Sequence, residues 1–403
     1  MRVACLDVGS TDTKLAVVDV GSGELVRTAT HPTTAGSDVL DGVDALLRVA
    51  GPVGRVYCCS SAGGGLRLAV IGFEALVSAD AAHRVALSAG ARVVHTTTGL
   101  LSTAAIGGLR AARPDVLLLA GGTDGGDIGT IVHNARRLAA ARWRVPVVVA
   151  GNRDAQEEVA AVLAGRGVPV TAAGNVLPRI GVIDPGPARA AIRDVFIRHV
   201  IGGKRLSRGA RFASMVDAAT PDAVLCGVGV LAAGVGGDLL VVDVGGATTD
   251  VYSALQPRDI PGGAVAGVLW QARTVEGDLG VRWNTGGIRA AAGRERLTVA
   301  PGRLGLAAAA VTVGVRRHTR AGRDLRHVVS VVVSGGVFRH AEAAAATAAV
   351  APTLADYAGG WALPRSPVVA VDTAYVLAAA GLLAGDHPGV AAALTATLRS
   401  VVA

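Results

Sequence analysis

The sequence predicts a multidomain α/β protein built around parallel sheets. Its 403 residues are enough for two or three buried cores. The composition is 51% hydrophobic, with 55 glycines and only 3% aromatic residues, which suits strands and small helices that pack closely. Two patterns along the chain support the same fold class: strands alternate with helices in the middle, and a glycine-rich hairpin occurs twice.

The first part of the chain is expected to form a small sheet with one helix. Its strands are predicted over residues 2–7, 13–20, 24–31 and 55–59. The helix is predicted over residues 38–48, with Asp38 as its capping residue. In the last part of the chain, a second hairpin is predicted over residues 239–244 and 249–255, a strand over 328–333, and helices from about 340, 372 and 388.

The middle of the chain alternates between strands and helices. Strands are predicted over residues 66–73, 91–97, 115–120, 145–150 and 168–172. Helices are predicted over residues 80–89, 102–112, 127–141, 154–164 and 187–200. This spacing favours a doubly wound parallel sheet.

The two hairpins share a pattern that suits binding of a polyphosphate. In each, an apolar strand ends in an aspartate, Asp7 or Asp243, and a turn rich in Gly, Ser and Thr follows. The glycines let backbone N–H groups converge on an anion, and the hydroxyl groups add donors. An aspartate at the strand end can hold Mg²⁺ through water. The candidate phosphate ligands are Gly9, Ser10, Thr11, Lys14, Gly245, Gly246, Thr248 and Thr249.

Other classes of protein are not favoured. The longest uncharged runs, residues 93–109 and 223–237, are shorter than the roughly 20 residues of a spanning helix, and no signal peptide is evident, so we expect a cytoplasmic protein without a membrane partner. The net charge of +8 comes from scattered arginines and only two lysines, Lys14 and Lys204, so no nucleic-acid partner is expected. The four cysteines lack metal-ligand spacing, and no P-loop motif occurs.

The two hairpins, with a third Gly-Gly loop after a strand, resemble the superfamily of actin, sugar kinases and seventy-kilodalton heat-shock ATPases. The resemblance implies two actin-like α/β lobes (ribonuclease-H-like) around ATP and Mg²⁺, with Asp7 and Asp243 as catalytic residues that set the metal and the attacking water. Gly335 and Gly336 would lie along the adenosine, and helices over 221–233 and 373–383 would connect the lobes. The implied organisation is a first lobe over 1–63, an inserted α/β domain over 64–200, a return with a connecting helix over 201–237, a second lobe over 238–370, and C-terminal helices over 371–403.

Over essentially its full length the chain also resembles the MutL/GlmL family, which is unrelated to the mismatch-repair protein called MutL. The resemblance rests on residues 7–14, 59–67, 119–127, 243–250 and 274–280. These proteins are actin-fold ATPases encoded beside adenosylcobalamin-dependent mutases such as glutamate mutase. The resemblance therefore implies a chaperone or reactivating factor whose partner is such a mutase. The candidate client or cofactor loop is Gly121, Gly122, Thr123, Asp124, Gly125, Gly126 and Asp127, and the family-signature acidic pair is Glu276 and Asp278.

Simpler structural interpretations stand beside these. Asp127 can merely cap a helix, and the Glu276–Asp278 pair can be a solvated charge cluster with Arg273 and Arg282. Lys14 can be an exposed strand residue, although its place beside the first turn favours phosphate contact. His318 and His327 are expected at the surface.

Two rival functions fit the same sequence. A small-molecule kinase of this fold would show ATP turnover that rises with an acceptor. An actin-like filament protein would sediment with ATP, although the large insertion argues against filament contacts.

Overall fold

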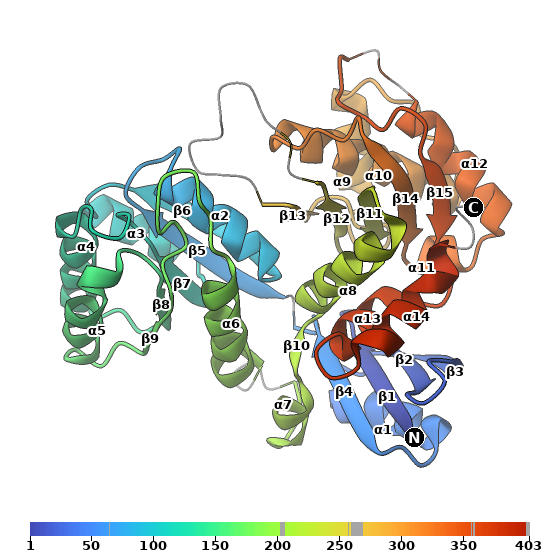
Figure 1. Ribbon diagram of the computed structural model, residues 1–403, viewed down its shortest axis with the longest axis horizontal. Coiled ribbons are helices and arrows are strands. Elements are labelled where there is room, and N and C mark those ends of the chain that lie inside the picture. The colour runs from blue at the N-terminus through green and yellow to red at the C-terminus, as the bar shows by residue number, and fades with distance from the viewer. Residues whose placement is uncertain are drawn as a thin grey trace. The chain divides into compact units, whose positions relative to one another are not determined.

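The chain forms two compact units. A computed structural model describes residues 1–63, 65–201, 206–256, 258, 269–355, 357 and 359–399, so Gly64 and Lys204 lie outside the described residues. The first unit comprises Met1–Ala62, Met215–Gln256 and Trp270–Ala403 (Figure 1). The second unit contains Gly63–Ser214, so it continues past residue 200, where the insertion was expected to end.

The first sheet of the first unit has the strand order β10-β4-β1-β2-β3. These strands are β1 (Arg2–Val8), β2 (Asp12–Asp19), β3 (Leu25–Pro32), β4 (Arg55–Ser60) and β10 (Ala218–Ala219). The first three run antiparallel to their neighbours, whereas β4 lies parallel to both β1 and β10. Helix α1 (Val39–Ala50) follows β3, and its capping residue is Asp38, whose side chain accepts a hydrogen bond from Leu40 N.

The second sheet of this unit repeats the arrangement, with the order β13-β12-β11-β14-β15. Its strands are β11 (Asp238–Val244), β12 (Thr249–Ala254), β13 (Gln271–Glu276), β14 (Val328–Ser334) and β15 (Val368–Val371). Again three strands form an antiparallel meander, and two further strands add in parallel to the first of them. Both sheets therefore have the same topology, which confirms the predicted fold class of two similar α/β lobes.

Helices pack against each sheet of the first unit. On the second sheet, α9 (Thr285–Arg294), α10 (Gly302–Arg320) and α12 (Ala343–Leu354) contribute Ile288, Val311 and Val350 to one apolar core. A second core joins both sheets through α8 (Thr220–Val235), α13 (Val376–Leu383) and α14 (Pro388–Arg399).

Two glycines let α8 and α13 approach closely. A Cβ atom at Gly227 would lie 2.0 Å from the Leu377 carbonyl oxygen, and one at Gly381 would lie 1.8 Å from that of Ala223. Both distances are impossible for a real side chain, so the helix backbones are in direct contact. The small-residue pattern that predicted the two connecting helices therefore has a packing cause.

The second unit is a doubly wound parallel sheet with the order β6-β5-β7-β8-β9. Its strands are β5 (Leu66–Gly72), β6 (Ala91–Thr98), β7 (Val116–Leu119), β8 (Val147–Val149) and β9 (Val170–Ala172). Its helices are α2 (Ser78–Ser88), α3 (Thr103–Ala111), α4 (Gly129–Ala140), α5 (Gln156–Ala164) and α6 (Gly186–Val195), followed by a π-helical turn (Phe196–Ile201) and α7 (Arg211–Met215). Numbered within the unit, the strand order is 2-1-3-4-5, one of the two common doubly wound orders.

No helix in the described part of the chain is both long enough and apolar enough to span a bilayer.

Candidate functional site

The two glycine-rich turns have the same backbone geometry. Gly9 N donates to Asp12 O at 3.1 Å, and Gly245 N donates to Thr248 O at 2.9 Å. A Cβ atom would lie 2.7 Å from the acceptor carbonyl at Gly9 and 3.0 Å from it at Gly245. The first turn therefore requires a glycine at its first position and the second strongly favours one, as the repeated sequence pattern suggests.

The turns face one another inside the first unit. A Cβ atom on Gly246 would lie 3.1 Å from Thr11 Oγ1 and 3.4 Å from Arg282 Cβ. Thr11 Oγ1 is buried and has no hydrogen-bond partner among the described residues. Since a buried hydroxyl group without a partner is costly, Thr11 presents an unused donor at the place where the two turns meet.

Asp7 is buried, and its carboxylate accepts three hydrogen bonds from side chains. Lys14 Nζ donates to Oδ2 at 2.9 Å, while Thr220 Oγ1 donates to Oδ1 at 2.7 Å. The Cys59 thiol also donates to Oδ1 at 3.7 Å, and burial raises its pKa, so it stays protonated. The carboxylate is thereby fixed between β1, β2 and the start of α8. Thr220 belongs to no motif, and only its place at a helix start marked it in the sequence.

Lys14 is an ion-paired residue and not an exposed strand residue. Its side chain is 24% exposed. Burial would lower its pKa, but the carboxylates of Asp7 and Asp243 hold the pKa above its ordinary value, so the ammonium group is charged. Lys14 Nζ also lies 4.3 Å from the ring centroid of Tyr375. A fixed cation therefore stands beside the first turn.

Asp243 shares a pocket with a third aspartate that the sequence analysis placed only at a helix start. Burial, together with repulsion from Asp250, Asp7 and Asp372, raises the pKa of Asp243 to about 6, although Lys14 opposes the shift. Burial also raises the pKa of Asp372, whose carboxylate accepts from the N–H group of Val376. The pocket is lined by Asp7, Lys14, Val224, Val241, Asp243, Ser334, Asp372, Tyr375, Leu377 and Ala378.

The Gly-Gly loop after β14 lies against the second turn. Gly335 has φ +114°, and a Cβ atom there would lie 2.2 Å from Val244 O. A Cβ atom on Gly336 would lie 3.7 Å from the Tyr375 hydroxyl group. The predicted adenosine motif therefore sits beside the pocket that holds Asp243.

The segment after β13 forms backbone hydrogen bonds with the second turn. Val281 N donates to Gly245 O at 3.1 Å, and Arg282 N donates to Gly246 O at 2.9 Å. A Cβ atom at Gly280 would lie 2.3 Å from the carbonyl carbon of Ala247, so only glycine fits there. This contact explains why the 274–280 run, which carried the family resemblance, contains a glycine at its end.

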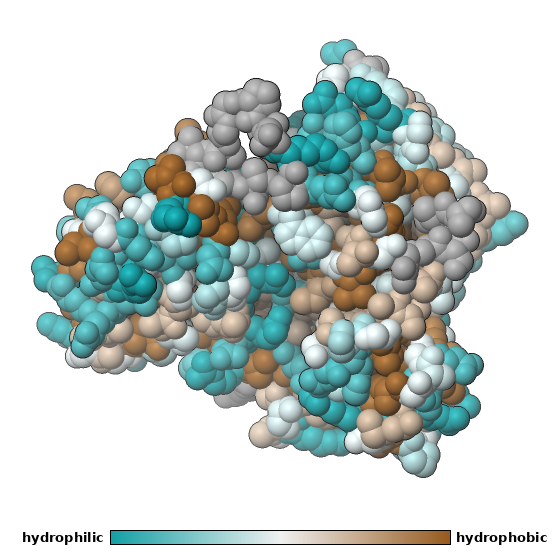
Figure 2. All heavy atoms as spheres, viewed as in Figure 1, coloured by the Kyte–Doolittle hydropathy of each residue, from teal (hydrophilic) through white to brown (hydrophobic). Residues whose placement is uncertain are grey.

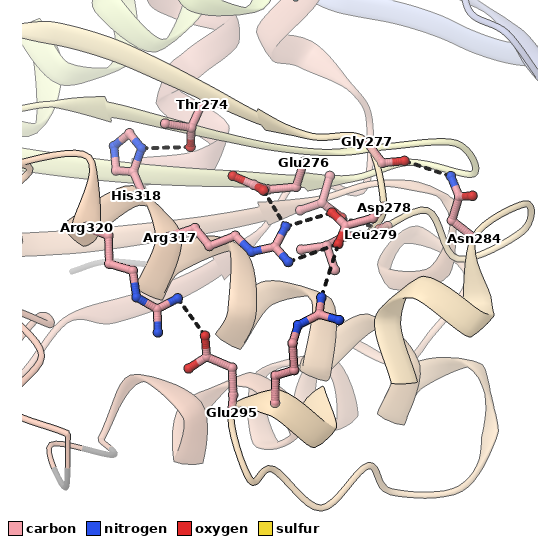
Figure 3. A network of polar contacts seen from close by, with 12 residues as sticks. Thr274, Glu276, Gly277, Asp278, Leu279, Asn284, Glu295, Arg317, His318 and Arg320 are labelled. Atoms are coloured by element: carbon pink, nitrogen blue, oxygen red, sulfur yellow. Dashed lines mark hydrogen bonds and ion pairs between the residues drawn. The ribbon is translucent and has the colours of Figure 1, made fainter. Parts of the chain in front are cut away.

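The acidic pair of that run is bound by an arginine of α10 (Figure 3). Arg317 Nη1 donates to Glu276 at 2.6 Å and to Asp278 at 2.7 Å, and Nη2 donates to the other Asp278 oxygen at 2.9 Å. The alternative that the pair forms a charge cluster with Arg273 and Arg282 was wrong. Arg273 instead forms a buried ion pair with Asp250, and Arg282 lies over the Trp283 ring. The pair is therefore an anchor between β13 and α10.

His318 is buried, which corrects the expected surface position. Its two ring nitrogens lie 3.0 Å from Thr274 Oγ1 and 2.9 Å from Ser253 Oγ. Burial lowers its pKa to about 3, so the ring is neutral. It therefore connects α10 to β12 and β13 as a structural residue, whereas His327 is exposed as expected.

In the second unit, the Gly121–Asp127 loop follows β7. Asp124 Oδ1 accepts from Arg153 N at 3.0 Å and from Asn175 Nδ2 at 2.9 Å, which ties the loop to those after β8 and β9. Asp127 accepts from Thr130 N at 3.0 Å and so caps the start of α4. The loop is therefore rigidly held, and the capping role expected of Asp127 is present.

Exposed apolar side chains lie on connections at the same edge of the sheet as this loop. In the described part of the second unit, all the large ones lie on connections that leave the carboxyl ends of strands: Leu76, Leu100, Ile128, Ile180 and Val182. Figure 2 shows brown side chains among teal ones on the visible face of this unit. The carboxyl edge of a doubly wound sheet is also where such folds bind their ligands. Apolar residues gathered at one edge are typical of an interaction surface.

A family model described as MutL protein matches residues 3–301 and 302–398. The chain belongs to the MutL protein family. Protein MutL of Clostridium tetanomorphum is 32% identical over 444 residues, which cover 95% of this chain and 96% of that protein. The family predicted from the sequence runs is confirmed.

Solved structures are similar to this MutL family member at a lower level. The ATP-dependent caprolactamase from Pseudomonas jessenii is 16% identical, with a TM-score of 0.40, over 95% of this chain and 71% of that chain. Component A of (R)-2-hydroxyglutaryl-CoA dehydratase from Acidaminococcus fermentans is 10% identical, with a TM-score of 0.33, over 97% of this chain and 99% of that chain. Likenesses at these TM-scores carry no argument about function.

Proposed function

We propose that this chain is an ATP-binding and ATP-hydrolysing chaperone or reactivating factor for an adenosylcobalamin-dependent mutase of the glutamate mutase type. The observation that carries the nucleotide part is Thr11 Oγ1, a buried hydroxyl group without a partner that faces Gly246 across two matched turns. A phosphate oxygen would give this donor its missing acceptor. The turns offer the convergent backbone donors that polyphosphates require.

The residues of the pocket fit a hydrated Mg²⁺. No three His, Cys, Asp or Glu side chains of the described residues are close enough together to hold a metal directly. Mg²⁺ keeps several waters, so Asp7 and Asp243 would hold it through them. When bound, the ion would neutralise charge on the phosphates. Lys14 would add a fixed positive charge beside the phosphates, and Asp243 would orient a water molecule.

The client is implied by the family resemblance, and the second unit supports a docking role. Its apolar residues Leu76, Leu100, Ile128, Ile180 and Val182 gather at the edge that carries the Gly121–Asp127 loop. A rigid loop among apolar side chains suits recognition of a folded protein surface. The function therefore assigns nucleotide binding to the first unit and client binding to the second.

Two measurements test this function. The first titrates Mg-ATP and follows phosphate release for wild type and Asp243→Asn, and unchanged turnover in the variant would remove the second turn from the site. The second measures affinity for an adenosylcobalamin-dependent mutase of the glutamate mutase type, with ATP and with ADP. A coupling of roughly 1–3 kcal/mol would change that affinity about 5- to 150-fold.

The outcomes also separate the rival functions. Equal client affinity in both nucleotide states would leave a binding protein without a switch, because a ligand shifts a conformation only by its differential affinity. No client binding, together with ATP consumption that a small acceptor stimulates, would favour a kinase. Sedimentation with ATP would favour a filament protein.

A further inference from the structure

Two cations of the first unit share one aromatic ring. Lys14 Nζ lies 4.3 Å from the ring centroid of Tyr375, and Arg339 Cζ lies 4.7 Å from it. A cation within about 6 Å of a ring face is attracted by the quadrupole of the ring. Tyr375 therefore holds both positive side chains at once.

The three residues come from separate parts of the fold (Figure 1). Lys14 lies on β2 of the first sheet, Arg339 ends α11 (Gly336–Arg339) after the second sheet, and Tyr375 precedes α13. Arg339 Nη1 also donates to Thr30 Oγ1 at 3.1 Å, and Thr30 is the cross-strand partner of Lys14. Arg339 thus connects the two lobes of the first unit by a hydrogen bond and by the shared ring.

The backbone at Tyr375 is strained. Its φ is +55°, in the left-handed region that a bulky side chain rarely adopts. Such a conformation costs on the order of 1–3 kcal/mol and persists only where the surroundings enforce it. Here Asp372 fixes the next turn by accepting from Val376 N at 3.1 Å. The ring is therefore held in a particular place, between the first turn and the Gly335–Gly336 loop.

Phosphate oxygens and the ring compete for the same partners. Lys14 stands beside the first turn, and Arg339 follows the predicted adenosine motif, so both cations flank the proposed nucleotide site. We propose that Lys14, Tyr375 and Arg339 form a cation–π latch that joins the two lobes, and that a bound nucleotide opens it by taking the cations from the ring. This inference rests on the proposed nucleotide binding. It makes Tyr375 a positioning residue, which acts through Lys14 and Arg339.

A matched pair of variants tests the latch. Tyr375→Phe keeps the ring face, whereas Tyr375→Leu removes it and keeps a bulky side chain at the same backbone position. Because the closed latch lowers the fraction of binding-competent protein, Tyr375→Leu should bind Mg-ATP roughly tenfold more tightly than wild type. Tyr375→Phe should resemble wild type. Equal affinity in all three proteins, or weaker binding by Tyr375→Leu alone, would overturn the latch.

Hydrogen exchange measured without nucleotide tests the latch separately from nucleotide binding, and exchange in the other elements shows whether a variant is destabilised as a whole. Hydrogen exchange of β2, β3 and α11 should be faster in Tyr375→Leu than in wild type, and Tyr375→Phe should again be normal. Thr30→Val, which removes only the bond from Arg339, should speed exchange in the same elements to a smaller extent. Unchanged exchange in Tyr375→Leu would contradict a latch between the lobes. If wild type binds no nucleotide, both the proposed function and the competition for the cations are contradicted. Faster exchange in Tyr375→Leu would then support only the contact between the lobes.

Discussion

Lys14 and Asp250 occupy equivalent positions in the two hairpins but carry opposite charges. Lys14 lies opposite Asp7 in the β1–β2 register, and Asp250 lies opposite Asp243 in the β11–β12 register. The first hairpin therefore neutralises its strand-end aspartate. The second places two carboxylates side by side, and of these two Asp250 forms an ion pair with Arg273. Burial and the neighbouring carboxylates raise the pKa of Asp243, which makes it a good candidate to act on a water molecule.

The raised pKa of Asp243 predicts a trade-off between stability and activity. The pKa rises from 3.8 to about 6 on folding because of burial and neighbouring carboxylates, so the cost of the deprotonated form grows between these two pH values and is fully present above about pH 6. Asp243→Asn should therefore increase the free energy of unfolding at pH 8 by on the order of 1–3 kcal/mol, and have little effect near pH 4. Thermal melts at both pH values measure this difference.

The same variant should lose ATP turnover, whereas wild-type turnover should rise with pH through about 6 as Asp243 deprotonates. A variant that is less stable than wild type at pH 8 would show that the carboxylate has an unseen partner.

Gly246→Ala tests the approach of the two turns. The new methyl group would lie 3.1 Å from Thr11 Oγ1, so the hydroxyl group must shift by a few tenths of an ångström. We expect Mg-ATP affinity to fall roughly tenfold, which is the value of about one hydrogen bond. Gly36→Ala is the matched control, because a Cβ atom there meets nothing within 4 Å. Equal affinities for both variants would show that the turns do not act together on a phosphate.

Arg317→Leu tests the anchor between β13 and α10, which is the contact of Arg317 with Glu276 and Asp278. It leaves Glu276 and Asp278 without the guanidinium group that binds both of them. We expect the free energy of unfolding to fall by about 2 kcal/mol, since hydrogen bonds between charged groups are lost from a partly buried place. Arg326→Leu is the control, because its pair with Asp324 is exposed and its loss should not be measurable in chemical denaturation. Comparable losses for the two variants would argue against the anchor.

Asp124→Ala tests whether nucleotide binding and client binding belong to different units. The change removes the acceptor of Arg153 N and Asn175 Nδ2, so the loop after β7 loses its ties to the neighbouring loops. We expect unchanged Mg-ATP affinity and at least severalfold weaker binding of the client mutase. Asp80→Ala, which breaks an ion pair with Arg84 on α2, should change neither. If Asp124→Ala abolishes nucleotide binding, the loop belongs to the nucleotide site.

Local patterns were enough to predict the hairpins and the doubly wound sheet. A glycine-rich turn after an apolar strand is a short-range signal, and so is alternation of strands and helices. The edge strand β13 was missed because Gln271–Glu276 is mostly polar, and its one buried arginine depends on Asp250. β15 was missed because four apolar residues are too short a signal to separate a strand from a turn.

The errors at individual residues have a common physical cause. His318 lies in a basic run that suggests a solvated surface, but neighbouring helix residues point about 100° apart, so α10 turns it inward while Arg317 and Arg320 stay nearer solvent. Tyr375, Thr220 and Arg339 reach the site through tertiary packing and belong to no recognisable motif. Sequence spacing cannot show such contacts.

The chain leaves and re-enters the first unit on neighbouring strands. Ala218 of β10 pairs with Cys59 of β4, and the Asp217 carboxylate accepts from Cys58 N at 2.8 Å just before it. The residues between Ala62 and Met215 therefore form an insertion that begins and ends at one edge of the first sheet. Evolution can exchange such a module without altering the order of the remaining strands. Under the proposed function, such a module taken from a relative would bring that relative's client preference and leave the nucleotide site of the first unit unchanged.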